Sequence, residues 1–122
     1  MRFTQDATSG VNLIRSYTQG ALRVNDQQLT SAIIVTASEL LVQPELRALG
    51  DLGGEHVARI LALEPELVIL GSGVRQVFPD ASFGTHFLKA GIGFEVMDTG
   101  AACRTFNVLV AEQRRAAAVL FP

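Results

Sequence analysis

Cysteine and charged residues are scarce in this sequence, and each scarcity excludes a class of protein. The 122 residues include one cysteine, Cys103, which cannot form an internal disulfide, so a disulfide-stapled secreted domain is excluded. Charged residues make up only 18%, and 10 basic against 12 acidic side chains give a net charge of −2. This balance lacks the basic field of a nucleic-acid binder. An apolar content of 48% excludes a disordered chain.

Long hydrophobic runs are also absent, although the mean hydropathy is +0.30. A membrane-spanning helix needs about 20 consecutive apolar residues, whereas the longest runs here are residues 32–35, 67–70 and 116–121. Polar residues such as Asp6 and Arg15 interrupt the amino terminus, where a signal peptide would have its apolar region. The sequence therefore predicts a cytoplasmic protein that does not span a membrane.

The patterning that is present divides the chain into an edge segment and one domain. Residues 1–19 show no steady hydrophobic period and are interpreted as an N-terminal arm or irregular edge segment. Residues 20–122 fit a single domain, since domains typically contain about 100–150 residues. This domain begins with a predicted β-hairpin of residues 21–24 and 28–36, whose turn contains Asn25 and Asp26.

After the hairpin, predicted helices and strands alternate. The expected elements are a connection with helical fragments (37–54), a helix (55–63), a strand (67–70), a helix (83–89), a strand (92–97) and a helix from Asp98 or Thr99 to about residue 112. The helix over 83–89 is expected to bury Phe83, Phe87 and Leu88. Residues 115–121 fit a helix or a final strand equally well.

This alternation predicts an α/β fold, in which helices pack on a sheet. The strand over 67–70 is an unbroken apolar run, which is typical of a strand covered on both faces. We expect it to be the parallel neighbour of the strand over 92–97, with the intervening helix joining the two.

Small and polar residues follow both of these strands. Residues 71–73, of sequence Gly-Ser-Gly, follow the first strand, and Asp98 and Thr99 follow the second and open a helix. Ligands of open α/β sheets favour the crevice beyond the carboxyl ends of strands, and the free N–H groups of a helix start favour anions. The glycines lack the third member and the helix context of a dinucleotide fingerprint, so no cofactor is predicted.

A polar set interrupts the otherwise apolar last helix. An asparagine within a helix is mildly unfavourable, but its side chain can hydrogen-bond the backbone of a neighbouring element. Glu112 could pair with an arginine across the fold. The favoured interpretation is a structural network, and a functional site is the alternative. The candidate ligand or partner residues are Gly71, Ser72, Gly73, Asp98, Thr99, Arg104, Thr105, Asn107 and Glu112.

No catalytic or metal-binding set is predicted. Cys103 lies early in the last helix without a Cys-x-x-Cys motif and is interpreted as a small buried hydrophobe. His56 and His86 are far apart in the sequence and lack the spacing of metal ligands. Most of the seven phenylalanines are expected in the core, with one or two available for a partner-binding patch.

Several of these segments together resemble the Mth938-type domain family. They are residues 67–73, 91–97 and 98–107, and the most specific set is Thr99, Arg104, Thr105, Phe106, Asn107 and Glu112. The resemblance covers about residues 20–122. It implies a three-layer α/β fold with a central mixed β-sheet and a last strand over 115–121. It implies no established enzyme activity, and mitochondrial members of the family act as complex I assembly factors through protein partners.

The expected function is therefore that of a non-enzymatic accessory domain that binds protein partners, in the assembly of a membrane respiratory complex. Association with subunits of that complex is expected, without binding to nucleic acid. The alternative is a small-molecule-binding, anion-binding or enzymatic domain that uses the crevice at residues 71–73 and 99–104. An exposed edge strand or phenylalanine patch could support a homodimer.

Overall fold

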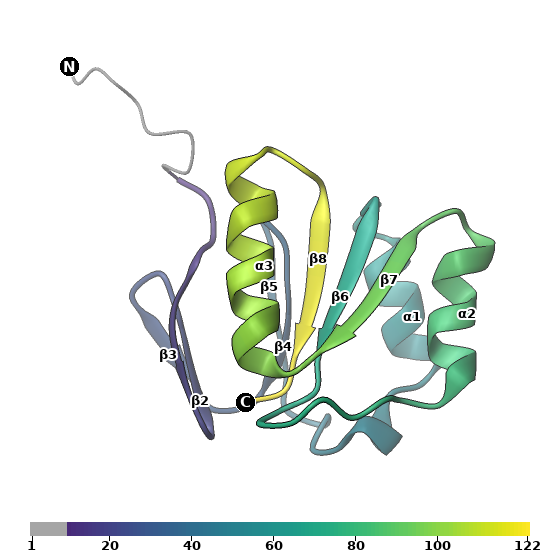
Figure 1. The fold of residues 1–122 in the computed structure, drawn as a ribbon, viewed down its shortest axis with the longest axis horizontal. Helices are drawn as coiled ribbons and strands as arrows, with labels where there is room; N and C mark the ends of the chain where they lie inside the picture. The colour runs from purple at the N-terminus through teal and green to yellow at the C-terminus, as the bar shows by residue number, and fades with distance from the viewer. Residues whose placement is uncertain (1–9) are drawn as a thin grey trace.

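The computed structural model describes residues 10–122 and places a long helix between two β-sheets (Figure 1). The smaller sheet is antiparallel and contains β1 (Ile14–Thr18), β2 (Ala21–Val24) and β3 (Gln27–Leu29). The larger sheet has the order β5-β4-β8-β6-β7 and contains β4 (Ala32–Val35), β5 (Leu40–Gln43), β6 (Leu67–Gly71), β7 (Gly93–Met97) and β8 (Ala116–Leu120). The helices are η1 (Leu49–Asp51), α1 (Gly54–Leu61), α2 (Ala81–Lys89) and α3 (Thr99–Ala111).

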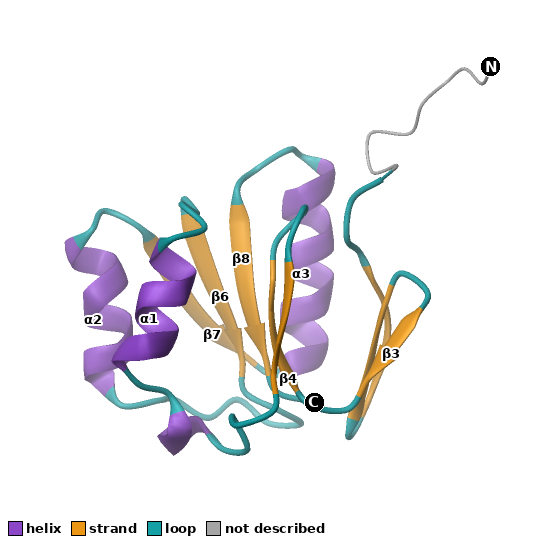
Figure 2. Ribbon diagram, turned by 180° about the vertical axis from the view of Figure 1, so that it is seen from behind, coloured by secondary structure: helices purple, strands orange, loops and turns teal. Residues whose placement is uncertain are grey.

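The larger sheet is mixed and covered on both faces. Strands β5, β4 and β8 pair antiparallel, whereas β8, β6 and β7 pair parallel. Helix α3 packs on one face, and α1 and α2 pack on the other (Figure 2). This arrangement confirms the predicted α/β fold, in which β6 and β7 are parallel neighbours joined through α2. The smaller sheet covers the outer side of α3.

Strand β8 lies at the centre of the larger sheet and is buried on both sides. Ala116, Ala118 and Leu120 belong to the core that includes α3, whereas Ala117 and Val119 belong to the core under α1 and α2. Successive side chains of a strand point to opposite faces, so an all-apolar segment of this length fits a doubly covered strand. The structure therefore resolves residues 115–121 in favour of the strand that the family resemblance implies.

Two predictions about the region that contains β3, β4 and β5 are wrong. The predicted strand over 28–36 is divided, because β3 ends at Leu29 in the hairpin while β4 begins at Ala32 and enters the larger sheet. The division follows burial, since all four residues of β4 are buried and β3 exposes both of its glutamines. Residues 40–43, which were expected in a connection with helical fragments, form the edge strand β5 by pairing with β4.

The edges of the fold also differ from expectation. Residues 14–18, within the segment interpreted as an irregular edge, form strand β1, which pairs with β2. Residues 1–9, which include Phe3, lie outside the described residues. Leu88 is not inward but 62% exposed, because α2 buries the face that carries Phe83 and Phe87. Within residues 10–122, no helix combines the length and the apolar character needed to cross a membrane.

Candidate functional site

The structure brings the two predicted strand ends together at one edge of the larger sheet. The side chain of Thr99 is fully buried there, and its Oγ1 accepts a hydrogen bond of 2.7 Å from the N–H of Gly73. The same hydroxyl donates to the carbonyl oxygen of Phe121 at 2.6 Å. The N–H of Thr99 in turn donates to the carbonyl of Gly73 at 2.8 Å. Thr99 therefore joins the ends of β6 and β8 to the start of α3.

Gly71 allows this close approach because it has no side chain. A Cβ atom at Gly71 would lie 2.9 Å from Cδ2 of Leu120 and 3.1 Å from the Cα of Thr99. It would also lie 3.0 Å from the Cβ of Ala102, on the first turn of α3. The space beside Gly71 is thus filled by the protein itself, and the glycine serves helix packing rather than the approach of a ligand.

Ser72 organises the loop that follows β6. Its Oγ donates to the carbonyl of Arg75 at 2.6 Å and accepts from the N–H of Val77 at 2.9 Å. The side-chain amide of Gln76 donates to the carbonyl of Val96 in β7 at 2.9 Å. These bonds fix residues 74–78, which we call the apolar loop because Val74, Val77 and Phe78 are all exposed on it.

Asp98 begins α3. Its Oδ1 accepts a hydrogen bond of 2.9 Å from the N–H of Ala101, so Asp98, and not Thr99, is the N-cap residue. A capping carboxylate satisfies one of the free N–H groups at a helix start and complements the helix dipole. The capping carboxylate therefore lies at the helix start where an anion would bind under the alternative hypothesis.

The polar residues further along α3 do not meet at this edge. Asn107 accepts from the N–H of Ile14 and donates to its carbonyl, both at 2.9 Å, so it holds β1 against the helix. Thr105 donates to Sδ of Met97 at 3.4 Å. Glu112 is exposed at the end of α3, and among residues 10–122 it makes no ion pair with an arginine. The two hydrogen bonds of Asn107 agree with the structural interpretation of this residue, and the arginine pairing that Glu112 could have made is not found among the described residues.

Arg104 remains exposed at the same edge as the apolar loop. Its Nη1 lies 3.6 Å from the position that a Cβ would take on Gly100, over the first turn of α3. Within the described part of the chain, neither Arg104 nor Arg75 has a carboxylate oxygen within 4 Å. Neither guanidinium group therefore forms an ion pair within the described residues, although Asp98 Oδ1 also lies near Arg104, 3.3 Å from the same Cβ position.

A polar cluster between β5 and α1 was not predicted from the sequence. The ring of His56 is buried, and its Nδ1 accepts a hydrogen bond of 3.0 Å from the N–H of Gly53. Its Nε2 lies 3.0 Å from Oε2 of Glu45. Arg59 donates to the same carboxylate oxygen at 3.0 Å and to the amide oxygen of Gln43 at 2.6 Å. The spacing of His56 and Arg59 on one helix face was visible in the sequence, but their partners were not.

The hydrogen bonds of the cluster determine the tautomer of His56 and lower the pKa of Glu45. Because Nδ1 of His56 accepts from Gly53, the ring proton must lie on Nε2, which donates to Glu45. This hydrogen bond from His56, supported by Arg59, lowers the pKa of Glu45 to about 2. His56 occupies the third position of α1 and caps the N–H of Gly53, as a glutamate does in a capping box. The cluster therefore connects α1 to β5 and its neighbouring turn, which is a structural role.

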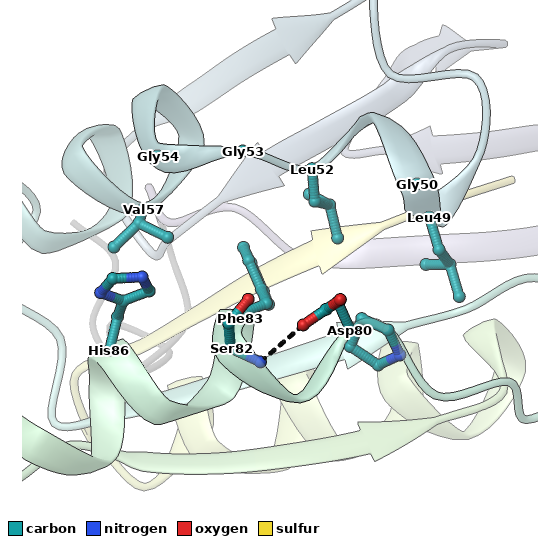
Figure 3. Close-up of a pocket in the computed structure, with 11 residues that line it drawn as sticks. Leu49, Gly50, Leu52, Gly53, Gly54, Val57, Asp80, Ser82, Phe83 and His86 are labelled. Carbon is teal, nitrogen blue, oxygen red and sulfur yellow. Dashed lines mark hydrogen bonds between the residues drawn. The ribbon is translucent and has the colours of Figure 1, made fainter.

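A cavity of about 290 Å³ lies between the segment from η1 to α1 and the start of α2 (Figure 3). Figure 3 shows His86 pointing from α2 toward Val57, whereas the carboxylate of Asp80 turns toward the backbone N–H of Ser82. Asp80 caps α2 by accepting from the N–H of Ser82 at 2.9 Å, which lowers the pKa of the Asp80 carboxyl. Both Asp80 and His86 are exposed, so the cavity is an open hollow without a desolvated acid–base pair.

Cys103 and Tyr17 lie together between α3 and the smaller sheet. Cys103 is buried, as predicted, and desolvation raises the pKa of its thiol to about 12. The hydroxyl of Tyr17 is buried without a hydrogen-bond partner in the described structure, and burial raises its pKa too. The Cys103 thiol, which its raised pKa keeps protonated at neutral pH, is therefore a poor nucleophile.

Within residues 10–122, no group of three or more His, Cys, Asp or Glu side chains is placed to hold a metal ion.

The proteins that are similar to this chain in sequence include an assembly factor and a membrane protein. The chain is 33% identical over 120 residues to the NADH dehydrogenase [ubiquinone] 1 alpha subcomplex assembly factor 3 of Danio rerio, which covers 97% of this chain and 68% of that protein. It is 27% identical over 107 residues to a 13 kDa major membrane protein of Francisella tularensis, with 87% of each chain covered.

Solved structures show the same fold. A Xanthomonas campestris protein solved by NMR is 35% identical, with a TM-score of 0.83 over 99% of this chain and 92% of that chain. A Bordetella pertussis protein described as an Mth938-like domain is 25% identical, with a TM-score of 0.81 over 100% of this chain and 92% of that chain. The family model for proteins of unknown function DUF498/DUF598 matches residues 14–121. The chain therefore belongs to this family, the family of Mth938-like domains.

Proposed function

We propose that this protein is a non-enzymatic, cytoplasmic accessory domain that binds protein partners during the assembly of a membrane-bound respiratory complex. The observation that carries the proposal is the similarity to assembly factor 3 of the NADH dehydrogenase complex, which extends over 97% of the chain in the Danio rerio protein. Similarity over the whole length relates the complete domain, rather than one shared element, to a protein that is named for assembly.

The geometry of the candidate crevice supports a binding protein over an enzyme. Thr99 and Ser72 engage their hydroxyls in short hydrogen bonds to the backbone, and Asp98 caps its helix. A catalytic site needs a nucleophile or base within reach of a substrate, and these groups serve the fold instead. Because these groups are already hydrogen-bonded within the protein, their geometry does not support the alternative, which is a small-molecule or anion-binding crevice at residues 71–73 and 99–104.

The proposal is tested by deleting the gene in the native host and measuring the assembled NADH dehydrogenase complex on native gels with an activity stain. The expected result is a loss of the full complex with accumulation of smaller subassemblies, and recovery when the wild-type gene is restored. A deletion strain with normal amounts of the full complex would contradict the proposal. Total levels of individual subunits serve as a control, since an assembly factor acts after their synthesis.

A further inference from the structure

The apolar loop, residues 74–78, concentrates exposed apolar side chains in one place. Six large apolar residues are exposed among residues 10–122, and three of them, Val74, Val77 and Phe78, fall within this loop of five. Phe78 has the greatest exposure of the six, at 69%. Single exposed apolar residues are ordinary, but a contiguous group that includes an aromatic ring is typical of a binding surface.

Three of the candidate site residues, Ser72, Gly73 and Thr99, help to hold the loop in place together with Gln76. The hydroxyl of Ser72 donates a hydrogen bond to the carbonyl of Arg75 and accepts one from the N–H of Val77. The side chain of Gln76 donates a hydrogen bond to the backbone of β7. At the base of the loop, Gly73 and Thr99 are joined by two hydrogen bonds, one donated by the N–H of each residue. An apolar loop fixed before binding loses little conformational entropy when a partner covers it, which increases affinity.

Positive charge borders the loop. Arg75 lies within it, and Arg104 extends over the adjacent first turn of α3. Asp80 and Asp98, the carboxylates nearest in sequence to Arg75 and to Arg104 respectively, each accept a backbone N–H at a helix start. Each of these two carboxylates has one oxygen engaged by a helix start, and neither guanidinium group has a carboxylate oxygen within 4 Å among the described residues.

The geometry points to the apolar loop as the docking surface for the protein partner, with Phe78 inserted into an apolar groove that aspartate or glutamate side chains border. This inference rests on the proposed function and names the surface that performs it. An aromatic side chain that enters a desolvated pocket, with neighbouring charge pairs, is the usual centre of a protein interface. The partner is thus defined by an apolar segment with carboxylates at the positions that meet Arg75 and Arg104.

The test places a photoreactive group on the loop in the intact protein. Phe78→p-benzoylphenylalanine is made in the full chain in the native host, and the crosslinked peptides are sequenced after irradiation. Leu88 on α2 and Val108 on α3, 62% and 56% exposed, receive the same group as matched controls. We expect crosslinking at position 78 to exceed that at either control about tenfold, since only that position lies at an energetic centre.

The chemistry of the crosslinked peptide decides the outcome. The inference requires one apolar segment that contains aspartate or glutamate. It also requires that Arg75→Glu lowers the crosslinking yield about tenfold, as expected for loss of a close charge pair. Changing the partner's acidic residue to lysine then restores the yield with Arg75→Glu. Equal yields at positions 78, 88 and 108, or a peptide without acidic residues, would overturn it.

A lipid surface is the other class of occupant, and a second measurement separates it. Purified wild-type protein and Phe78→Asp are sedimented with vesicles of phosphatidylglycerol and phosphatidylcholine. Binding of the wild type, lost in Phe78→Asp and accompanied by no protein crosslink, would overturn the inference in favour of a membrane. Absence of vesicle binding agrees with it.

The outcomes also distinguish the loop from the function itself. If gene deletion blocks complex assembly but Phe78→Asp restores it as fully as the wild type, the docking surface is wrong and the proposed function stands. If deletion has no effect on assembly, the proposed function fails, whatever the loop crosslinks to. Because Phe78 is exposed, Phe78→Asp is expected to unfold at the same temperature as the wild type, and matching thermal unfolding curves would exclude misfolding as a cause.

Discussion

Asn107 and Ile14 exchange two hydrogen bonds of 2.9 Å across 93 residues of sequence. The asparagine side chain accepts from the N–H of Ile14 and donates to its carbonyl, as a neighbouring strand would do. One side chain on α3 thus replaces a missing strand partner and fixes the smaller sheet on the outer side of the helix.

Replacing Asn107 with alanine is expected to lower the free energy of unfolding by about 2 kcal/mol, because two buried backbone groups of Ile14 lose their partners. Urea unfolding followed by circular dichroism measures the change. Asn107→Asp keeps the size but removes the donor, so it should be destabilised as well. Val108→Ala, an exposed neighbour on the same helix, should stay within about 0.5 kcal/mol. Equal stabilities of the asparagine and alanine forms would show that the two bonds contribute nothing.

Thr99→Val is expected to destabilise the protein more than Thr99→Ser does. Valine keeps the shape but leaves the N–H of Gly73 and the carbonyl of Phe121 unpaired, at a cost of about 2 kcal/mol. Serine keeps the hydroxyl and loses only a methyl group, worth about 1 kcal/mol. Thermal unfolding of the two variants gives the comparison, and the reverse order would contradict the bridging role of the hydroxyl.

Gly71→Ala is expected to cost about 1–3 kcal/mol through overpacking, since the added Cβ meets backbone of α3 as well as side chains. Gly50→Ala is the matched control, because no atom lies within 4 Å of a Cβ at that position and its φ is not positive. Urea unfolding should therefore separate the two alanine variants. A Gly71→Ala protein as stable as the wild type would mean that α3 moves away without cost.

The stability that Glu45 contributes is expected to disappear in acid. Its pKa in the folded state is about 2, below the value of 4.5 for a free glutamate side chain. A depressed pKa means that the contribution is fully present above about pH 4.5 and is lost as the pH falls toward 2. The measurement is a carboxyl-carbon NMR titration of Glu45. In His56→Gln, which removes the largest cause of the shift, the pKa should rise, whereas an unchanged titration would disprove the assigned cause.

Cys103 is expected to resist alkylation in the folded protein. Burial raises the pKa of its thiol to about 12, so the reactive thiolate is almost absent at neutral pH. The rate of labelling by iodoacetamide, followed by mass spectrometry, should increase by several orders of magnitude in denaturant. Rapid labelling under native conditions would indicate that the smaller sheet opens away from α3.

The elements that the sequence predicted correctly are those with a local signal. An apolar run identified β6, and the predicted helix from Asp98 or Thr99 to about residue 112 corresponds to α3. Asp98, one of the two predicted start residues of that helix, is its N-cap, because a capping side chain acts within three residues. Residues 27–43 were harder, since the sheet that a short apolar strand joins depends on distant neighbours.

The candidate site shows the same division. The sequence alone determined that residues 71–73 and 98–99 lie together, because the carboxyl ends of neighbouring parallel strands meet at one edge of the sheet. Only the tertiary structure decided what those residues do. The approach of α3 to β6 fills the space beside Gly71, and the hydroxyls of Ser72 and Thr99 turn to the backbone. Exposure is likewise a property of packing, so Phe78 differs from the buried phenylalanines only in the folded protein.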